Sequence, residues 1–376
     1  MKRVAAQASF AGPRSIATSL SWEGAAGVRG LHVNLQGGRS SVSGVVATVF
    51  GCTGFLGRFV VNRLGKIGSQ VIVPYRGEES AFRHLKVMGD LGQIAPVWFD
   101  LRDKETVRRA VQYSNVVINL LGKRWETRNF SFDDVHPEAT RTIAEAAKEA
   151  GVERFIQVSA AGADVNSPSA FARSKGESEK VLREIFPDAT ILRPTVLYGA
   201  RDNFLVKWGM IARYWPAFVR TLKDTKFQPL YVADMATALM NALADPETAG
   251  KTYELGGPKV YTLEEITELV TRLTFLEPSV VDVPFPALRA FAQVTQPFLR
   301  KPRFTVEELD YWKSGDVVVP ENAPLTINNL NFSTEDLTVL EKEAVNFLRL
   351  YRKPATMNLI LEDQLDVKSP RARASR

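Results

Sequence analysis

The sequence contains few of the residues that cross-linked folds and metal sites require. Cys52 is its single cysteine, so no disulfide bond can form within the chain. The three histidines, His32, His84 and His136, lie far apart and follow no spacing that is typical of metal ligands. The sequence therefore predicts neither a disulfide-stabilised fold nor a metal site.

Long apolar runs are also missing, and the excess of positive charge is unevenly placed. No uncharged apolar stretch approaches the roughly 20 residues of a membrane-spanning helix, so we expect at most a peripheral contact with a membrane. The net charge is +6, but +4 of it lies before Val45, where five basic residues face a single acid, Glu23. Because a nucleic-acid-binding domain carries its basic surface on the folded part of the chain, we expect no nucleic-acid partner.

Residues 1–43 are rich in Ala, Ser, Gly and Arg and nearly free of acids. This composition is typical of a mitochondrial transit peptide, whereas Pro13 and Arg14 interrupt the apolar block that a secretory signal needs. We expect import into mitochondria, with cleavage between about Arg29 and Arg39. The alternative is an N-terminal extension without any targeting role.

Short apolar runs alternate with helical patterns through the next 150 residues or so. Continuous apolar runs are typical of parallel strands with both faces covered by helices. The alternation predicts an α/β fold, a Rossmann-like doubly wound parallel sheet with a smaller C-terminal α/β lobe. The expected strands are 45–50, 70–76, 95–99, 115–121, 155–158 and 190–192, and the expected helices are 104–113, 133–150 and 171–186.

The pattern changes after Asn203. We expect strands at 226–232, 252–255 and 279–283 and helices at 204–218, 233–244, 287–298 and 335–350, with a further helix starting at Thr262, and assign these pieces to the smaller lobe. The predicted divisions are a leader at 1–43, a Rossmann-like domain at 44–257 with parts of the small lobe inserted after 203, a C-terminal lobe at 258–354 and a polar tail at 355–376. The apolar stretch from Phe285 to Phe298 is either a core helix of that lobe or a face for a partner or a membrane surface.

A glycine-rich turn follows the first predicted strand. Gly51, Gly54 and Gly57 leave exposed backbone N–H groups beside a helix N-terminus, an arrangement that binds the pyrophosphate of a dinucleotide. Cys52 within this turn is expected to be a small packed side chain, with a reactive thiol as the alternative.

The residue at the end of the second strand indicates which dinucleotide is bound. An NAD site places a carboxylate about 20 residues beyond the glycines, where it accepts a hydrogen bond from the ribose. This chain has Arg76 there, and a guanidinium suits a 2′-phosphate, so we expect NADP(H). The alternative is a solvated Arg76, with Glu78 or Glu79 on the ribose.

Two further strand ends are candidates for cofactor contacts. Asp100-Leu101 follows the third strand and could lie against the adenine, and Leu120-Leu121-Gly122 follows the fourth. Each could equally be an ordinary end of a strand.

In several of these motifs the chain resembles the short-chain dehydrogenase/reductase superfamily, in its extended or atypical branch. The resemblance is carried by the three glycines, Asp100-Leu101, Ser159, Lys175 and Arg193-Pro194, and it covers about residues 45–257. It implies a serine and a Tyr-x-x-x-Lys pair at the reacting end of the cofactor, the tyrosine moving a proton and the lysine binding the ribose.

The tyrosine of that pair is absent here, because Phe171 occupies its position, four residues before Lys175. A phenyl ring cannot donate or accept a proton, and a general acid or base typically contributes about 10²–10⁴-fold to a rate. We therefore expect no catalytic residue and a cofactor that is held but not turned over. The expected cofactor contacts are Gly51, Thr53, Gly54, Phe55, Leu56, Gly57, Arg76, Asp100, Leu101, Leu120, Gly122, Ser159, Lys175 and Pro194.

Within the superfamily, the chain resembles the nucleotide-binding accessory subunits of respiratory complex I. The resemblance rests on the transit-like leader and on residues 48–58, 71–77, 193–199 and 201–204, and extends over nearly the whole chain after the leader. It implies a tightly held NADPH, other complex I subunits as partners, a peripheral place on the matrix side of the inner membrane, and a role in assembly or stability of the complex.

Two alternatives stay open at this point. The chain could be an active atypical reductase, in which Lys175 or the substrate replaces the missing tyrosine and Tyr198 or Tyr214 supplies a hydroxyl. It could also be a sensor that reports NADPH occupancy to a partner.

Overall fold

The computed structural model describes residues 38, 40–215, 217–299 and 302–357, all of which belong to one structural unit that spans 31–376. The expected transit peptide, its cleavage site and most of the polar tail lie outside the described residues.

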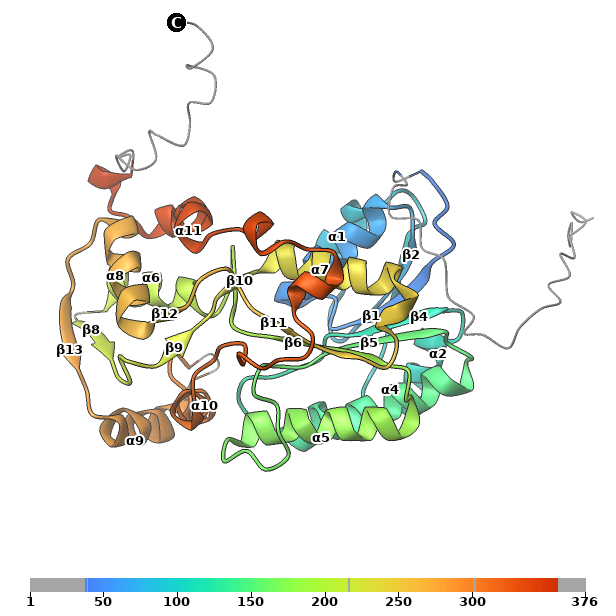
Figure 1. Cartoon of the computed structure of the whole chain (residues 1–376), viewed down its shortest axis with the longest axis horizontal. Coiled ribbons are helices and arrows are strands. Elements are labelled where there is room, and N and C mark those ends of the chain that lie inside the picture. The colour runs from blue at the N-terminus through green and yellow to red at the C-terminus, as the bar shows by residue number, and fades with distance from the viewer. Residues whose placement is uncertain (1–37, 39, 216, 300–301, 358–376) are drawn as a thin grey trace, which may run out of the picture. The chain divides into compact units, whose positions relative to one another are not determined.

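Seven parallel strands form the central sheet, in the order β11-β6-β5-β4-β1-β2-β3 (Figure 1). All six strands expected before residue 203 are among them, and the prediction of a doubly wound parallel α/β fold is confirmed. The strands are β1 (Val46–Phe50), β2 (Gln70–Tyr75), β3 (Ile94–Trp98), β4 (Val116–Asn119), β5 (Arg154–Val158), β6 (Thr190–Pro194) and β11 (Thr252–Leu255).

Helices cover both faces of this sheet. In Figure 1, α1 (Phe55–Lys66) and α7 (Val232–Ala244) lie on one face, and α2 (Lys104–Val111), α4 (Pro137–Glu149) and α5 (Ala170–Ile185) lie on the other. Each face has its own apolar core. The single helix expected over 133–150 is divided into α3 (Phe132–Val135) and α4, because Pro137 lacks an N–H and begins a new helix.

Two elements after Asn203 return to the sheet, although the sequence pattern placed them in the smaller lobe. β11 pairs with β6 in parallel register, with Tyr253 opposite Leu192. α7 packs against α1, and its Val232, Met235 and Leu239 share the core of that face. The local pattern of these two elements is that of any apolar strand and helix, so only long-range pairing distinguishes their place.

The remaining elements form the smaller lobe around a separate, aromatic-rich core that includes Phe204, Trp208 and Trp312. The helix that starts after Thr262 begins with a capping box to Glu265, as expected. The helices of this lobe are α6 (Leu205–Tyr214), α8 (Leu263–Thr274), α9 (Phe285–Thr295), α10 (Val306–Ser314) and α11 (Leu340–Leu348). Its strands form short two-stranded pairs: β7 (Leu197–Tyr198) with β10 (Leu230–Tyr231), β9 (Lys226–Phe227) with β12 (Tyr261–Thr262), and β8 (Ala217–Arg220) with β13 (Ser279–Asp282).

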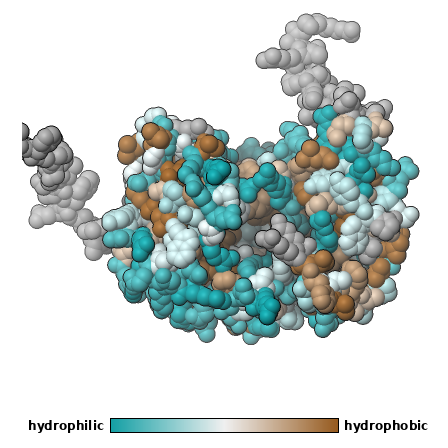
Figure 2. Space-filling view, turned by 180° about the vertical axis from the view of Figure 1, so that it is seen from behind, coloured by the Kyte–Doolittle hydropathy of each residue, from teal (hydrophilic) through white to brown (hydrophobic). Residues whose placement is uncertain are grey.

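The apolar stretch around α9 has two different faces. Leu288 and Ala292 are buried in the core of the lobe, whereas Phe291, Val294 and Phe298 are 49%, 67% and 85% exposed. Apolar side chains gather over this part of the lobe, at the lower right of Figure 2. Among the described residues, no helix is both long enough and apolar enough to cross a bilayer.

Candidate functional site

The glycine-rich turn between β1 and α1 has the tight geometry that its sequence predicts. Gly51 has a φ of +78°, and a Cβ there would lie 3.0 Å from the backbone of Leu120. The N–H of Gly54 donates to the carbonyl oxygen of Gly51 at 2.9 Å. A Cβ on Gly57 would lie 2.4 Å from that same carbonyl oxygen, so only glycine allows the helix to pack this closely on the turn.

The N-terminus of α1 is left open for an anion. Gly54 caps this helix without a side-chain hydrogen bond, and the first turn contains no acid. Free N–H groups at the positive end of a twelve-residue helix attract negative charge, which fits the pyrophosphate expected here.

Cys52 in this turn is a packed, unreactive side chain. Its thiol is buried and donates to the carbonyl oxygen of Pro74 at 3.3 Å. Burial raises the pKa of the thiol to about 12, so it stays protonated at neutral pH. No group of three or more potential metal-ligating side chains occurs in the part of the chain that the structure describes.

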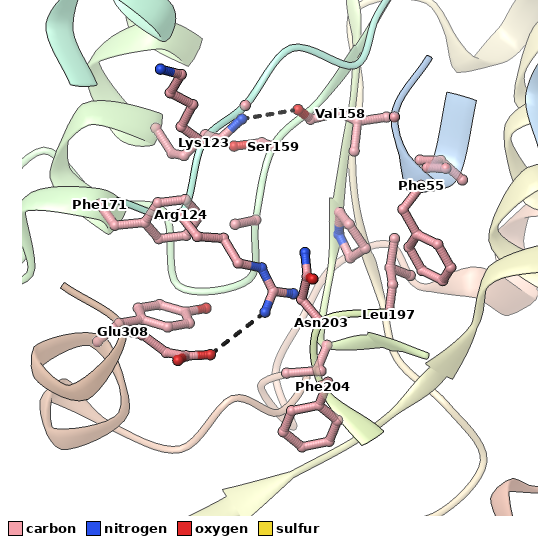
Figure 3. Close-up of a pocket in the computed structure, with 18 of the residues that line it drawn as sticks. Phe55, Lys123, Arg124, Val158, Ser159, Phe171, Leu197, Asn203, Phe204 and Glu308 are labelled. Atoms are coloured by element: carbon pink, nitrogen blue, oxygen red, sulfur yellow. Dashed lines mark hydrogen bonds and ion pairs between the residues drawn. The ribbon is translucent and has the colours of Figure 1, made fainter. Parts of the chain in front are cut away.

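A cavity of about 450 Å³ lies between the carboxyl end of the sheet and the smaller lobe (Figure 3). It brings together eight of the fourteen expected cofactor contacts: Gly54, Phe55, Leu56, Leu120, Gly122, Ser159, Lys175 and Pro194. The other six lie outside its lining: Gly51, Thr53, Gly57, Arg76, Asp100 and Leu101. Their role in binding stays a prediction, as does that of the eight.

Lys175 and Ser159 lie close together in the lining of this cavity. The Lys175 ammonium is buried and donates to the carbonyl oxygens of Leu121 at 3.2 Å and Val158 at 3.5 Å. Desolvation lowers the pKa of Lys175 to about 8, against the opposing charge of Glu179. The buried Ser159 hydroxyl has no hydrogen-bond partner among the described residues. A buried hydroxyl without a partner is costly, so this end of the cavity fits a polar ligand such as a ribose or nicotinamide amide.

Phe171 lies within a cluster of aromatic rings at the same end. Its ring meets those of Tyr311, His136 and Phe132 edge-on, with centroids 5.3, 5.8 and 6.0 Å away. Tyr311, from α10, lines the cavity, but its hydroxyl donates to the carbonyl oxygen of Ala161 at 2.7 Å and burial raises its pKa.

The two tyrosines named as alternative proton donors lie elsewhere. Tyr198 is buried, and its hydroxyl donates to the carbonyl oxygen of Thr338. Tyr214 is 70% exposed on α6. Neither lines the cavity.

His136 holds the loop after β4 in place, a role that the sequence did not indicate. Its Nε2 accepts from the backbone N–H of Lys123 at 3.2 Å, and its Nδ1 lies 2.8 Å from the hydroxyl of Ser174. Desolvation, together with the charge of Lys175, lowers the pKa of His136 to about 2. The imidazole is therefore neutral and carries its proton on Nδ1.

Two further basic side chains, which the sequence did not single out as cofactor contacts, lie near Arg76. Its guanidinium carbon lies 4.7 Å from the centre of the Phe130 ring, where Arg102 approaches to 4.5 Å and the Lys123 nitrogen to 5.0 Å. The signals in the sequence were the positions of Arg102, directly after Asp100-Leu101, and of Lys123, directly after Gly122.

The acids near Arg76 are occupied by local contacts. An Asp100 oxygen accepts from the backbone N–H of Arg102 at 3.1 Å, which holds the turn after β3. Glu79 pairs with Lys86 at 3.1 Å, and Glu78 accepts from Ser80 at 3.4 Å.

The smaller lobe contributes an ion-pair bridge across the cavity. Glu308 on α10 contacts Arg124, from the loop after β4, at 3.6 Å (Figure 3), and the ammonium of Lys207 on α6 at 2.8 Å. Lys207 is buried, and desolvation lowers its pKa. The cavity is therefore lined by both lobes, with Asn203 and Phe204 also in its lining.

Comparisons with known proteins identify the family of the chain. Residues 51–207 match the model of a family described as NAD(P)H-binding. A Dictyostelium discoideum protein named NADH dehydrogenase (ubiquinone) 1 alpha subcomplex subunit 9, mitochondrial, is 40% identical over 88% of this chain and 91% of its own length. The NADH-ubiquinone oxidoreductase 40 kDa subunit, mitochondrial, of Neurospora crassa is 40% identical over 86% of this chain and 84% of its own.

Solved structures share the fold at low sequence identity. The structure of Citrobacter sp. triphenylmethane reductase complexed with NADP(H) has a TM-score of 0.62 and 20% identity, and covers 80% of this chain and 99% of its own.

Proposed function

Since the chain belongs to the family of subunit 9 of the mitochondrial NADH dehydrogenase (ubiquinone) 1 alpha subcomplex, we propose that it is an accessory subunit of respiratory complex I that holds NADPH without turning it over. Its partners are then other subunits of that complex. Its place is peripheral, on the matrix side of the mitochondrial inner membrane, and it acts in assembly or stability of the complex.

The observation that carries the non-catalytic part is the environment of Phe171. The superfamily resemblance assigns this position to a proton-transferring tyrosine, and here it is a phenyl ring packed against Tyr311 and His136. The Tyr311 hydroxyl is tied to a backbone carbonyl and its pKa is raised, while His136 is neutral with a pKa of about 2. The rings around Phe171 therefore provide no group poised to move a proton near neutral pH.

The groups that bind a nucleotide are nevertheless retained. The open N-terminus of α1 suits the pyrophosphate, and Ser159 and Lys175 suit the ribose and nicotinamide. Arg76 supports NADPH over NADH, because Glu78 and Glu79 are engaged with Ser80 and Lys86.

The nucleotide content of the purified native complex tests the proposal. Denaturation and mass analysis should release about one NADPH for each copy of this chain, and the bound cofactor should stay reduced in the presence of candidate carbonyl substrates. NAD(H) in its place, or no nucleotide, would contradict the cofactor assignment. If the complex oxidised NADPH steadily and Lys175→Met abolished this activity, the proposal that the chain is non-catalytic would be contradicted.

A matched pair of variants on α5 controls this test. Lys175→Met keeps much of the side-chain volume but removes the buried ammonium, so the nucleotide should be lost. Lys180→Ala changes an exposed lysine of the same helix and should leave the nucleotide content unchanged.

Position and partners need separate measurements. We expect the chain to migrate with complex I on native gels, to be extracted from membranes by alkaline carbonate, and to resist protease in intact mitoplasts. A large free pool would contradict the role as a subunit.

A further inference from the structure

Three basic side chains surround the ring of Phe130, and they come from three different connections, those after β2, β3 and β4. We propose that Arg102 and Lys123 act with Arg76 as the site that recognises the 2′-phosphate, and so set the preference for NADPH over NADH. The inference rests on the proposed function, and it adds two specificity-determining residues and the ring that positions them.

The cluster carries an excess of positive charge. No ion pair joins Arg76, Arg102 or Lys123 to an acid within the described residues. Burial lowers the pKa of Lys123, and the nearby charge of Arg76 lowers it further. Like charges gathered on one ring repel each other, so an anion bound among them would relieve this repulsion.

Asp134 is an acid near the cluster, but its carboxylate is already hydrogen-bonded within its own helix cap. Asp134 accepts hydrogen bonds from the backbone N–H and the hydroxyl of Ser131, at 2.8 and 2.9 Å, in the capping box of α3. These bonds lower its pKa most, and Arg102 and Lys123 lower it further. Asp134 thus acts on Arg102 and Lys123 only, and one carboxylate beside a cluster of three cations leaves an excess of positive charge for a dianionic phosphate.

The cations are held in place by the loop that carries the ring. Thr127 and Phe130 pair through backbone hydrogen bonds in both directions, at 3.0 and 3.1 Å, which folds the loop into a short hairpin. The Lys123 ammonium donates to the Thr127 hydroxyl at 2.9 Å, and the Arg102 guanidinium donates to the carbonyl oxygen of Asn129. The face of Phe130 then holds the three groups together through cation–π contacts.

The position in the fold distinguishes this phosphate from the pyrophosphate. The pyrophosphate belongs to the turn and helix N-terminus after β1, whereas the adenosine ribose belongs at the carboxyl end of β2. Arg76 directly follows β2, which ends at Tyr75, and β2 lies between β1 and β3 in the sheet. A group on the 2′-oxygen would therefore extend toward the connections after β2 and β3.

Binding of two nucleotide fragments to the full chain, stripped of its nucleotide, tests the inference. 2′,5′-ADP carries the 2′-phosphate and 5′-AMP lacks it. Arg102→Ala and Lys123→Met should each weaken 2′,5′-ADP about tenfold to a hundredfold, the loss expected for a charge-assisted bond to phosphate, while 5′-AMP changes less than about threefold. Phe130→Leu should weaken 2′,5′-ADP in the same selective way, because the cations lose their platform.

Arg128→Ala is the matched control, since it removes an exposed arginine of the same loop. It should change neither fragment. Equal losses for both fragments, or no loss for either, would overturn the role of Arg102 and Lys123. Wild-type protein that binds the two fragments equally would instead refute the NADPH preference itself, so the two failures can be told apart.

Discussion

Arg193 on β6 is the cation shared by two buried carboxylates, which makes its removal a sharp test of how the sheet is held. Its guanidinium donates to Glu179 on α5 at 2.6 Å and to Glu254 on β11 at 2.9 Å. The Glu179 and Glu254 side chains are only 8% and 10% exposed. The pair Arg193-Pro194, which the sequence offered as part of a cofactor motif, therefore also ties the edge strand to the rest of the sheet.

We expect Arg193→Met to destabilise the chain by about 3 kcal/mol at neutral pH. Leaving a buried charge without its partner typically costs about 3–5 kcal/mol, and the partial exposure of Arg193, at 26%, places this case at the lower end. Methionine retains the aliphatic part of the side chain, so the loss is chiefly electrostatic.

The stability loss of Arg193→Met should depend on pH, and the pKa of Glu254 determines in which direction. Burial raises the pKa of Glu254 while Arg193 lowers it, so the variant should raise this pKa further. An acid with a raised pKa in the folded state is destabilising above that pKa, and its cost disappears as the pH falls below it. The deficit of the variant should thus be largest at pH 8 and shrink toward pH 5, by at most about 1.4 kcal/mol per pH unit for each proton taken up.

Urea unfolding of the full chain, followed by circular dichroism at pH 8, 7, 6 and 5, measures this difference. Adding Glu179→Gln and Glu254→Gln to Arg193→Met removes both unpaired charges and should recover most of the lost stability. A deficit that does not change with pH, or that the two glutamines do not relieve, would refute the electrostatic explanation in favour of lost packing.

Two further predictions concern the site. His136 has a pKa of about 2 in the folded chain against an ordinary value of 6.5, so the unfolded chain takes up a proton below pH 6.5 that the folded chain does not. The free energy of unfolding should fall by up to about 1.4 kcal/mol for each pH unit below 6.5. The variant His136→Asn should make this part of the pH profile flatter. If its free energy of unfolding fell as steeply as that of the wild type, the burial of a neutral imidazole would be contradicted. Gly57→Ala places a Cβ 2.4 Å from the carbonyl oxygen of Gly51, and should cost about 1–3 kcal/mol in thermal unfolding and release the nucleotide. Full nucleotide content in this variant would contradict the proposed fit of the turn.

The parts of the fold that the sequence predicts are those with local signals. The glycine turn and the alternating strands and helices before residue 203 were predicted from spacing and apolar runs alone, and the sheet confirms that fold. β11 and α7 were placed in the wrong lobe, because the pairing of Thr252–Leu255 with Ile191–Pro194 joins segments about 60 residues apart. A short apolar strand gives no local indication of the neighbour that it will choose.

In the candidate site, too, residues with a local signal in the sequence differ from residues that only long-range packing brings into place. Arg76 stands at a fixed distance from the glycine turn, and Ser159 and Lys175 belong to the motif of the resembled superfamily, so the sequence names these three as expected cofactor contacts. Phe130 and Tyr311 do not, because their places depend on a loop hairpin and on the smaller lobe.

Phe171 stands where the resemblance expects a tyrosine, and both the sequence and the structure bear on whether another hydroxyl could replace it. From the sequence, a missing hydroxyl could be replaced from elsewhere in the chain, and the structure does bring one to the place, on Tyr311 with its ring centroid 5.3 Å from that of Phe171. That hydroxyl, however, donates to the carbonyl oxygen of Ala161, and burial raises its pKa. Burial makes the Tyr311 hydroxyl a weaker acid, and its proton is already donated to a backbone carbonyl. Under the function that we propose, Tyr311 is therefore a structural hydroxyl of the cavity and does not take the place of the tyrosine expected at position 171.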